Sequence, residues 1–262
     1  MSERWIQHSQ ALLEASVLIA RVDPNAVRRR LERQSLEPFV EHTAGHPLLI
    51  ELWQVQRGQL ALGGAALEEL GQACGPWLGA ATRALVDRFG SYCEILFSVP
   101  DVRVPDFSEP CQLVLGMYTD SALSQRGASW LRYGYGKELA SIERCEFATF
   151  TVQAGRSRLR ARFAPAASGL HSPPLYLRQW LTQPLLGLHD GVRSLSRLSR
   201  DFDRAQVVPA RGTFSIEDSR LEDLLAGEHA VRGFDEGAGL LGFHAACLPV
   251  QLSFPRSIAR CA

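Results

Sequence analysis

One residue in this chain could act as an amine nucleophile through its side chain. Lys137 is the only lysine, and every other one of the 28 basic residues is an arginine. Arginine stays protonated in proteins, whereas a desolvated lysine can lose its proton and attack a carbonyl carbon. An arginine-favouring codon bias would also leave a single lysine, so the surrounding residues must decide between the two explanations.

The segment before Lys137 suits a buried amine. Gly134 and Gly136 flank Tyr135, and glycines let the backbone turn tightly and let a ligand approach it closely. Tyr133 and Tyr135 offer apolar surface near the amine, and burial disfavours the charged form of a lysine. The segment therefore favours an amine that is kept from water.

The elements before this segment are predicted from their patterns. Residues 92–99 alternate as a strand, with Cys93, Ile95, Phe97 and Val99 on a wholly apolar face and Glu94 on the mixed face. We expect this strand to end at Pro100. A glutamate on a mixed face is more often exposed than catalytic. A second strand is predicted over 112–118, and Asp120 is the expected cap of a helix that breaks at Gly134.

The order of these motifs resembles the acetoacetate decarboxylase superfamily. Its members combine a Tyr-x-Glu strand, a second strand, a helix and a Gly-aromatic-Pro-Lys-Lys-Leu loop. Here the corresponding stretches are Tyr92-x-Glu94, Met117-Tyr118-Thr119-Asp120 and 134–140, with 184–187 and 248–250 also in matching places. The resemblance covers about residues 45–255, and its specific part is 92–140.

The resemblance implies residue roles. Lys137 would form a Schiff base with a keto acid, and Glu94 would be the acidic partner. The implied substrate-binding residues are Tyr135, Tyr92, Met117 and, by a loose match, Arg57. A lysine that is desolvated or next to a second cation is a better nucleophile, as in acetoacetate decarboxylase itself.

Two positions depart from the superfamily pattern. Gly136 stands where its members have proline, and Glu138 replaces the second lysine of the pair. A neighbouring carboxylate would favour the charged amine if the two side chains met, but adjacent side chains of an extended segment point apart. The departures put acetoacetate decarboxylation itself in doubt and leave imine chemistry open.

The predicted fold is of the α+β class and mainly antiparallel β, a closed or strongly curled β-barrel or β-cone with peripheral helices. Strands outnumber helices and do not alternate with them regularly, and a hairpin is predicted over 146–153 and 157–163. Further strands are expected near 205–216 and 239–253, and a helix over 175–181. Residues 36–262 form the expected acetoacetate decarboxylase-like domain. Residues 1–35 are predicted as a helical N-terminal extension, because apolar residues from Trp5 to Val17 recur at helical spacing and Asp23-Pro24 can start a second helix.

Composition argues against several function classes. Net charge is zero, which argues against nucleic acid and anionic membranes as partners. The six cysteines form no C-x-x-C pair, and the first apolar stretch, 15–20, is too short to span a membrane, so a cytoplasmic protein is expected. His42 and His46 are four apart, but Gly45 and Pro47 make a shared helix face improbable, so no metal site is predicted.

The sequence favours a lyase-like enzyme, a carbon–carbon lyase that acts on a small keto acid by decarboxylation or related imine chemistry without a cofactor. One alternative is a non-catalytic member of the same fold that binds a hydrophobic carbonyl compound. Another is an assembly protein that acts through residues 1–35. A homo-oligomer is compatible with each of these.

Overall fold

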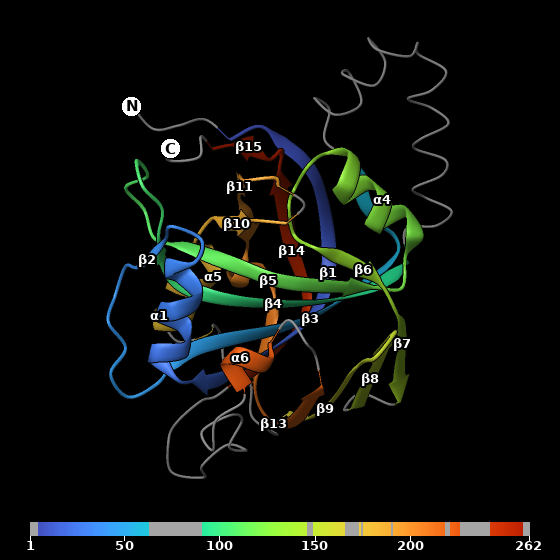
Figure 1. The fold of residues 1–262 in the computed structure, drawn as a ribbon. Helices are drawn as coiled ribbons and strands as arrows, with labels where there is room; N and C mark the ends of the chain where they lie inside the picture. The colour runs from blue at the N-terminus through green and yellow to red at the C-terminus, as the bar shows by residue number, and fades with distance from the viewer. Residues whose placement is uncertain are drawn as a thin grey trace.

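A computed structural model describes residues 5–62, 91–145, 149–165, 173, 175–189, 191–217, 221–225 and 242–258. Within them the chain is mainly β (Figure 1). The strands are β1 (Gln7–Val22), β2 (Glu37–Pro38), β3 (His46–Leu62), β4 (Tyr92–Arg103), β5 (Cys111–Thr119), β6 (Lys137–Leu139), β7 (Ser141–Cys145), β8 (Thr149–Ala154), β9 (Ser157–Pro165), β10 (Leu185–Gly187), β11 (Ser194–Ser196), β12 (Leu198–Arg200), β13 (Gln206–Glu217), β14 (Gly242–Ser253) and β15 (Arg256–Ser257). The helices are α1 (Pro24–Glu32), α4 (Ala122–Trp130), α5 (Leu175–Thr182), α6 (Glu222–Leu225) and the 3₁₀ turn η2 (Phe202–Arg204).

The strands form one continuous, strongly curled sheet. Its order is β15-β11-β10-β5-β4-β3-β1-β14-β13-β9-β8-β7, with β2, β6 and β12 paired to β4, β5 and β14. All pairings are antiparallel except those of β5 with β6 and with β10. Register shifts interrupt β1 between Leu13 and Ala15, and such bulges bend a strand and increase its twist. The predicted class, a mainly antiparallel curled sheet with peripheral helices, is confirmed.

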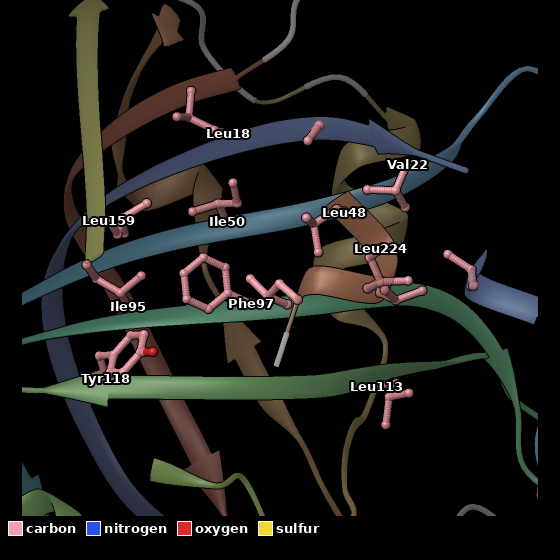
Figure 2. Packing of buried hydrophobic residues seen from close by; sticks show 14 of the residues in the cluster. Leu18, Val22, Leu48, Ile50, Ile95, Phe97, Leu113, Tyr118, Leu159 and Leu224 are labelled. Atoms are coloured by element: carbon pink, nitrogen blue, oxygen red, sulfur yellow. The ribbon is translucent and has the colours of Figure 1, made fainter. Parts of the chain in front are cut away.

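The sheet is buried on both faces. Alternate residues of β4 divide between two apolar clusters, with Ile95 and Phe97 in one and Leu96 in the other. Figure 2 shows the first cluster, in which Phe97 and Tyr118 lie on adjacent strands with their ring centroids 6.2 Å apart. The second cluster includes Met117, Tyr133 and Tyr135 and is covered by residues of α5, β12 and η2. The loop that leads to Lys137, which contains Tyr133 and Tyr135, therefore lies on the face of the sheet that the second cluster covers.

Helix α1 begins as its sequence predicts. The Asp23 side chain accepts a hydrogen bond from the backbone N–H of Asn25 (3.0 Å), and Pro24 occupies the first helical position. The helix covers the first cluster with Val27 and Leu31. It lies beside α6 (Figure 1), and an ion pair of 2.6 Å joins its Arg30 to Asp223 of α6.

The predicted helical extension is wrong for residues 7–22. These residues form β1, which pairs with β3 on one side and β14 on the other. Val17 and Leu18 are both buried because the sheet is covered on both faces. A strand of this kind has a continuous apolar run, which periodicity cannot distinguish from a buried helix. Residues 7–22 are therefore not part of a separate extension: β1 is an inner strand of the sheet.

The other predicted strands and helices are present, and the differences concern only the residues at which they begin or end. Strand β4 does not end at Pro100 but continues to Arg103 through a register shift, with Asp101 at φ 58°. Ser121, not Asp120, caps α4 by accepting from the N–H of Ser124 (3.2 Å). The predicted hairpin is confirmed as β8 and β9, apart from residues 146–148, which lie outside the described residues. The strands at 206–217 and 242–253 and the helix at 175–182 also match.

Within the described ranges, no helix is long and apolar enough to cross a membrane.

Candidate functional site

Lys137 begins β6 and points into the molecule. Strand β6 runs parallel to β5 with Lys137 beside Met117, and Met117 in turn is paired with Leu96 of β4. The Lys137 side chain is only 10% exposed. Its Nζ therefore lies away from bulk water, as the sequence predicts for a nucleophilic amine.

Glu94 is the ionic partner of this amine. It is 5% exposed and lies on β4 opposite Thr119 of β5. Thr119 is two residues further along β5 than Met117, the partner of Lys137. Lys137 Nζ donates to Glu94 Oε1 at 2.6 Å. The glutamate on the mixed face is therefore buried and in contact with the amine, although a glutamate at such a position is more often exposed. Acid and amine meet because β6 returns to the edge of β5.

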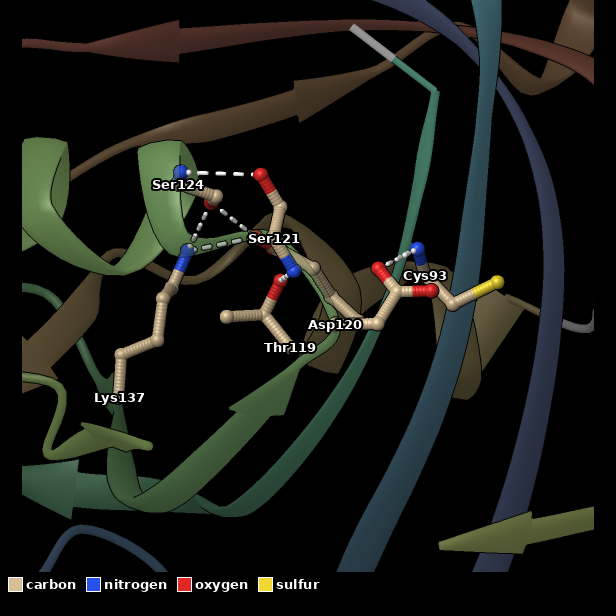
Figure 3. A network of polar contacts seen from close by, with 7 residues as sticks. Cys93, Thr119, Asp120, Ser121, Ser124 and Lys137 are labelled. Atoms are coloured by element: carbon tan, nitrogen blue, oxygen red, sulfur yellow. Dashed lines mark hydrogen bonds and ion pairs between the residues drawn. The ribbon is translucent and has the colours of Figure 1, made fainter. Parts of the chain in front are cut away.

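Ser124 of α4 completes a triangle with these two groups. Lys137 Nζ donates to Ser124 Oγ (2.9 Å), and Ser124 Oγ donates to Glu94 Oε1 (2.5 Å). Figure 3 shows the Lys137 side chain reaching Ser124 at the start of α4. The same turn is fixed to β4, since the Asp120 carboxylate accepts from the N–H of Cys93 (2.8 Å). Sequence reasoning missed Ser124; its place one turn after the predicted helix start is the signal that could have indicated it.

Tyr92 extends the cluster on the β4 side. Burial together with the nearby Glu94 raises the pKa of the Tyr92 hydroxyl, and the Ser124 side chain opposes the shift. The phenol therefore stays protonated and can donate a hydrogen bond. Burial likewise raises the pKa of Asp120.

The loop before Lys137 depends on its glycines. Gly134 and Gly136 have φ of +65° and +60°, in the left-handed region, and a Cβ at 136 would lie 3.1 Å from the His189 ring. Proline has φ fixed near −65°, so it could not adopt this conformation. The loop therefore follows a path that the proline of the superfamily pattern would not allow.

Tyr135 lies deeper in the same face. It is 6% exposed, its hydroxyl hydrogen-bonds Ser196 Oγ, and its ring centroid is 5.2 Å from that of Tyr133. Burial raises the pKa of its hydroxyl. Tyr135 thus forms part of the wall behind the site, with its polar end held by Ser196.

A second buried ion pair, which sequence reasoning also missed, lies further along this face. Arg200 Nη2 and Glu51 Oε2 are 2.6 Å apart, with the two side chains 2% and 0% exposed. The Trp53 indole N–H also donates to Glu51 (3.2 Å), and Trp53 is paired with Glu94 on the neighbouring strand. The other carboxylate oxygen, Glu51 Oε1, is buried without a hydrogen-bond partner within the described part of the chain.

Of the remaining residues that the sequence singles out, Met117 lies beside Lys137 and Glu138 does not point toward the site. Met117 is 1% exposed and adjacent to Lys137 in the sheet. Glu138 is exposed, on the opposite side of β6 from the buried amine, as the alternation predicts. Arg57 belongs to β3, but its side chain lies outside the described residues.

His42 and His46 come together, and each has a hydrogen-bond partner of its own. Their ring centroids are 4.6 Å apart, but His42 contacts Asp101 (2.9 Å) and His46 contacts the Pro100 carbonyl (3.0 Å). No cluster of three or more His, Cys, Asp or Glu side chains suited to a metal ion occurs among the residues that the structure describes.

The comparison with known proteins rests on structure. No family model matches the chain, and no curated protein matches it by sequence. A structure of acetoacetate decarboxylase is similar, with a TM-score of 0.61 at 13% identity over 98% of this chain and 92% of that one. The enduracididine biosynthesis enzyme MppR complexed with pyruvate gives 0.57 at 14% identity, over 98% and 92%. MppR with the condensation product of pyruvate and imidazole 4-carboxaldehyde gives 0.57 at 13% identity, over 98% and 91%. At such identities the likeness concerns the fold: this chain has the fold of acetoacetate decarboxylase.

Proposed function

We propose that this protein is a Schiff-base-forming, lyase-like enzyme in which Lys137 condenses with a small keto acid. The observation that carries the proposal is the only lysine of the chain, 10% exposed, in contact with a buried carboxylate. The fold adds support, because one enzyme that shares it is acetoacetate decarboxylase and another was solved with pyruvate.

The first step is a proton transfer within the triangle. Lys137 Nζ gives a proton to Glu94 Oε1, 2.6 Å away, and becomes a neutral amine. Ser124 Oγ contacts both groups and can hold the carboxyl group in place while the proton moves. The lone pair of Nζ then attacks the carbonyl carbon of the keto acid.

The second step forms the electron sink. The C–N bond forms as the carbonyl π bond breaks, and a proton moves from nitrogen to oxygen to give a carbinolamine. Protonated Glu94 returns its proton to the hydroxyl group, which leaves as water, and an iminium results. The iminium accepts the electron pair released by loss of carbon dioxide or of an α-proton. Protonation at carbon and hydrolysis then restore Lys137.

The test is reductive trapping. The protein is incubated with a panel of small α- and β-keto acids, reduced with borohydride and digested, and released carbon dioxide is measured in parallel. Since Lys137 is the only side-chain amine, the peptide that contains it is the only internal peptide that can gain the mass of the reduced adduct. We expect that adduct, and carbon dioxide from at least one acid.

Lys137→Arg is the matched control, because arginine keeps the positive charge beside Glu94 but cannot form the imine. The α-amine of Met1 serves as an internal standard for non-specific labelling. Labelling of the Met1 peptide with no gain at the Lys137 peptide, for every acid tested, would contradict the proposal.

A second candidate function is non-catalytic binding of a hydrophobic carbonyl compound. The observation that favours it is the double hydrogen bonding of Lys137 Nζ, which donates to both Glu94 and Ser124 and is thereby held within the polar cluster. Binding of the same ligands by wild type and Lys137→Arg, with no adduct in either, would support this candidate.

A further inference from the structure

A pocket with two arginines lies outside the Lys137 site. It measures about 150 Å³ and is lined by Arg132, Gly191, Val192, Arg193, Ser257 and Ile258. Arg132 is in the loop between α4 and Lys137, Arg193 immediately precedes β11, and Ser257 belongs to β15. Parts of the chain that are distant in sequence therefore meet at this pocket.

The Arg193 guanidinium has unused hydrogen-bond donors. Its Nε and Nη2 atoms are buried, and neither has a hydrogen-bond partner among the described residues. A buried donor of a charged group without an acceptor is costly, so almost all such donors in folded proteins are paired. These two nitrogens form one edge of the guanidinium, and that edge offers the two parallel N–H groups that bind a carboxylate or phosphate in bidentate fashion.

The charge of the pocket favours an anion. Of the six described residues that line it, two are arginines and none is acidic. Ser257 adds a hydroxyl group, which can donate a further hydrogen bond. The described lining residues thus supply positive charge and donors.

The backbone around the pocket is fixed by several hydrogen bonds. The Ile258 N–H donates to the Arg193 carbonyl (2.9 Å), and the Ser194 hydroxyl donates to the Tyr133 carbonyl (2.6 Å). The His189 N–H donates to the Gly134 carbonyl (3.0 Å). The two arginines are therefore held on neighbouring, connected segments rather than on separate loops.

We propose that this pocket binds a small oxyanion, a carboxylate or a phosphate, between the guanidinium groups of Arg132 and Arg193. The site is distinct from the Lys137 cluster, and it does not depend on Schiff-base chemistry. Because Arg132 and Arg193 flank the segments that hold the lysine loop, a bound anion would also stabilise that loop.

The test measures binding of inorganic phosphate and of acetate to the full chain, by calorimetry and thermal unfolding at constant ionic strength in a chloride buffer. We expect one site for at least one of the two anions, with an unfolding temperature that rises with its concentration. Arg193→Gln should weaken that binding about tenfold or more, the effect of losing charge-assisted hydrogen bonds. Arg158→Gln, an exposed position on β9, is the control and should bind as wild type does. The anion that gives the larger shift identifies the ligand class.

A second readout separates an anion site from a structural arginine. Without added phosphate or acetate, Arg193→Gln should unfold at the same temperature as wild type or higher, because the change removes an unpaired buried charge. Arg132→Gln, at an exposed position, should fold normally and also bind the anion more weakly. Equal binding by wild type and both variants, or no binding of either anion by wild type, would overturn the proposal. So would an Arg193→Gln protein that is less stable without these anions and binds them unchanged.

Discussion

The contact between Lys137 and Glu94 joins two charges that are almost withdrawn from water. Their side chains are 10% and 6% exposed, and the atoms are 2.6 Å apart. The cost of desolvating a buried ion pair offsets most of its attraction, so the pair adds little net stability. Removing one partner is different, because it leaves an uncompensated buried charge. The pair is therefore better explained by proton transfer than by stability.

Lys137→Met tests that electrostatic description. The variant leaves the Glu94 carboxylate buried without its partner, and we expect a loss of about 3 kcal/mol in the free energy of unfolding. Adding Glu94→Gln should recover most of the loss, since the charge is then removed. Urea unfolding at pH 7 measures both. If Lys137→Met alone is as stable as wild type, water already screens the Glu94 carboxylate.

How far this site could be predicted from the sequence depends on the kind of signal each residue carries. Lys137 is identified by being the only lysine, and Glu94 by the Tyr-x-Glu motif. Ser124, Glu51 and Arg200 carry no local pattern, because their roles depend on which elements fold against them. Glu51 and Arg200 are 149 residues apart and meet only after β12 pairs with β14. Such contacts are properties of tertiary structure.

At the scale of elements, the sequence predicts most strands but not the structure of residues 7–22. Strand β4 was recognisable because polar residues interrupt one of its faces. Strand β1 was not, because its stretch from Val17 to Ala20 is apolar on both faces. The mistake follows from position: an inner strand covered on both faces loses the alternation that distinguishes strands from helices.

Gly136→Ala tests the loop that connects α4 to β6. Gly136 and Gly155 have nearly the same φ, +60° and +57°, but a Cβ at 136 meets the His189 ring at 3.1 Å while nothing lies within 4 Å at 155. Gly155→Ala therefore measures backbone strain alone, about 1–2 kcal/mol. We expect Gly136→Ala to destabilise the protein by more, and to reduce borohydride trapping at Lys137 because the loop must shift.

Urea unfolding and the trapping assay on both variants give the comparison. Equal losses of stability with unchanged trapping would mean that His189 yields easily and that the loop tolerates the added methyl group.

At the scale of the whole molecule, the correction to β1 also decides between functions. Residues 1–35 were a candidate assembly segment, but β1 is an inner strand and α1 covers the first cluster. A deletion of this segment would remove part of the core and could not report on partner binding alone. The assembly hypothesis therefore loses the observation that motivated it, while the prediction of a strongly curled sheet is confirmed.

The stability of the whole sheet should depend on pH through His46. This residue begins β3, is 2% exposed, and hydrogen-bonds the Pro100 carbonyl on β4. The pKa of His46 is lowered to about 4, mainly by burial and also by the neighbouring His42, while the hydrogen bond to the Pro100 carbonyl and the carboxylates of Asp101 and Glu41 oppose the shift. In the unfolded chain the pKa is near 6.5.

Between about pH 6.5 and pH 4 the unfolded state consequently binds more protons at this position than the folded state does. Stability from His46 is therefore complete above about pH 6.5, is lost as pH falls, and changes no further below about pH 4. From pH 7 to pH 5 the expected loss in the free energy of unfolding is about 2 kcal/mol, at about 1.4 kcal/mol per pH unit below the unfolded pKa.

His46→Gln keeps a donor for the Pro100 carbonyl but does not titrate. In urea unfolding, this variant should therefore lose correspondingly less stability than wild type between the two pH values. Because His244, whose pKa burial also lowers, titrates in both proteins, the difference between them isolates His46. An identical pH dependence in both would mean that His46 accepts its proton without breaking the β3–β4 contact.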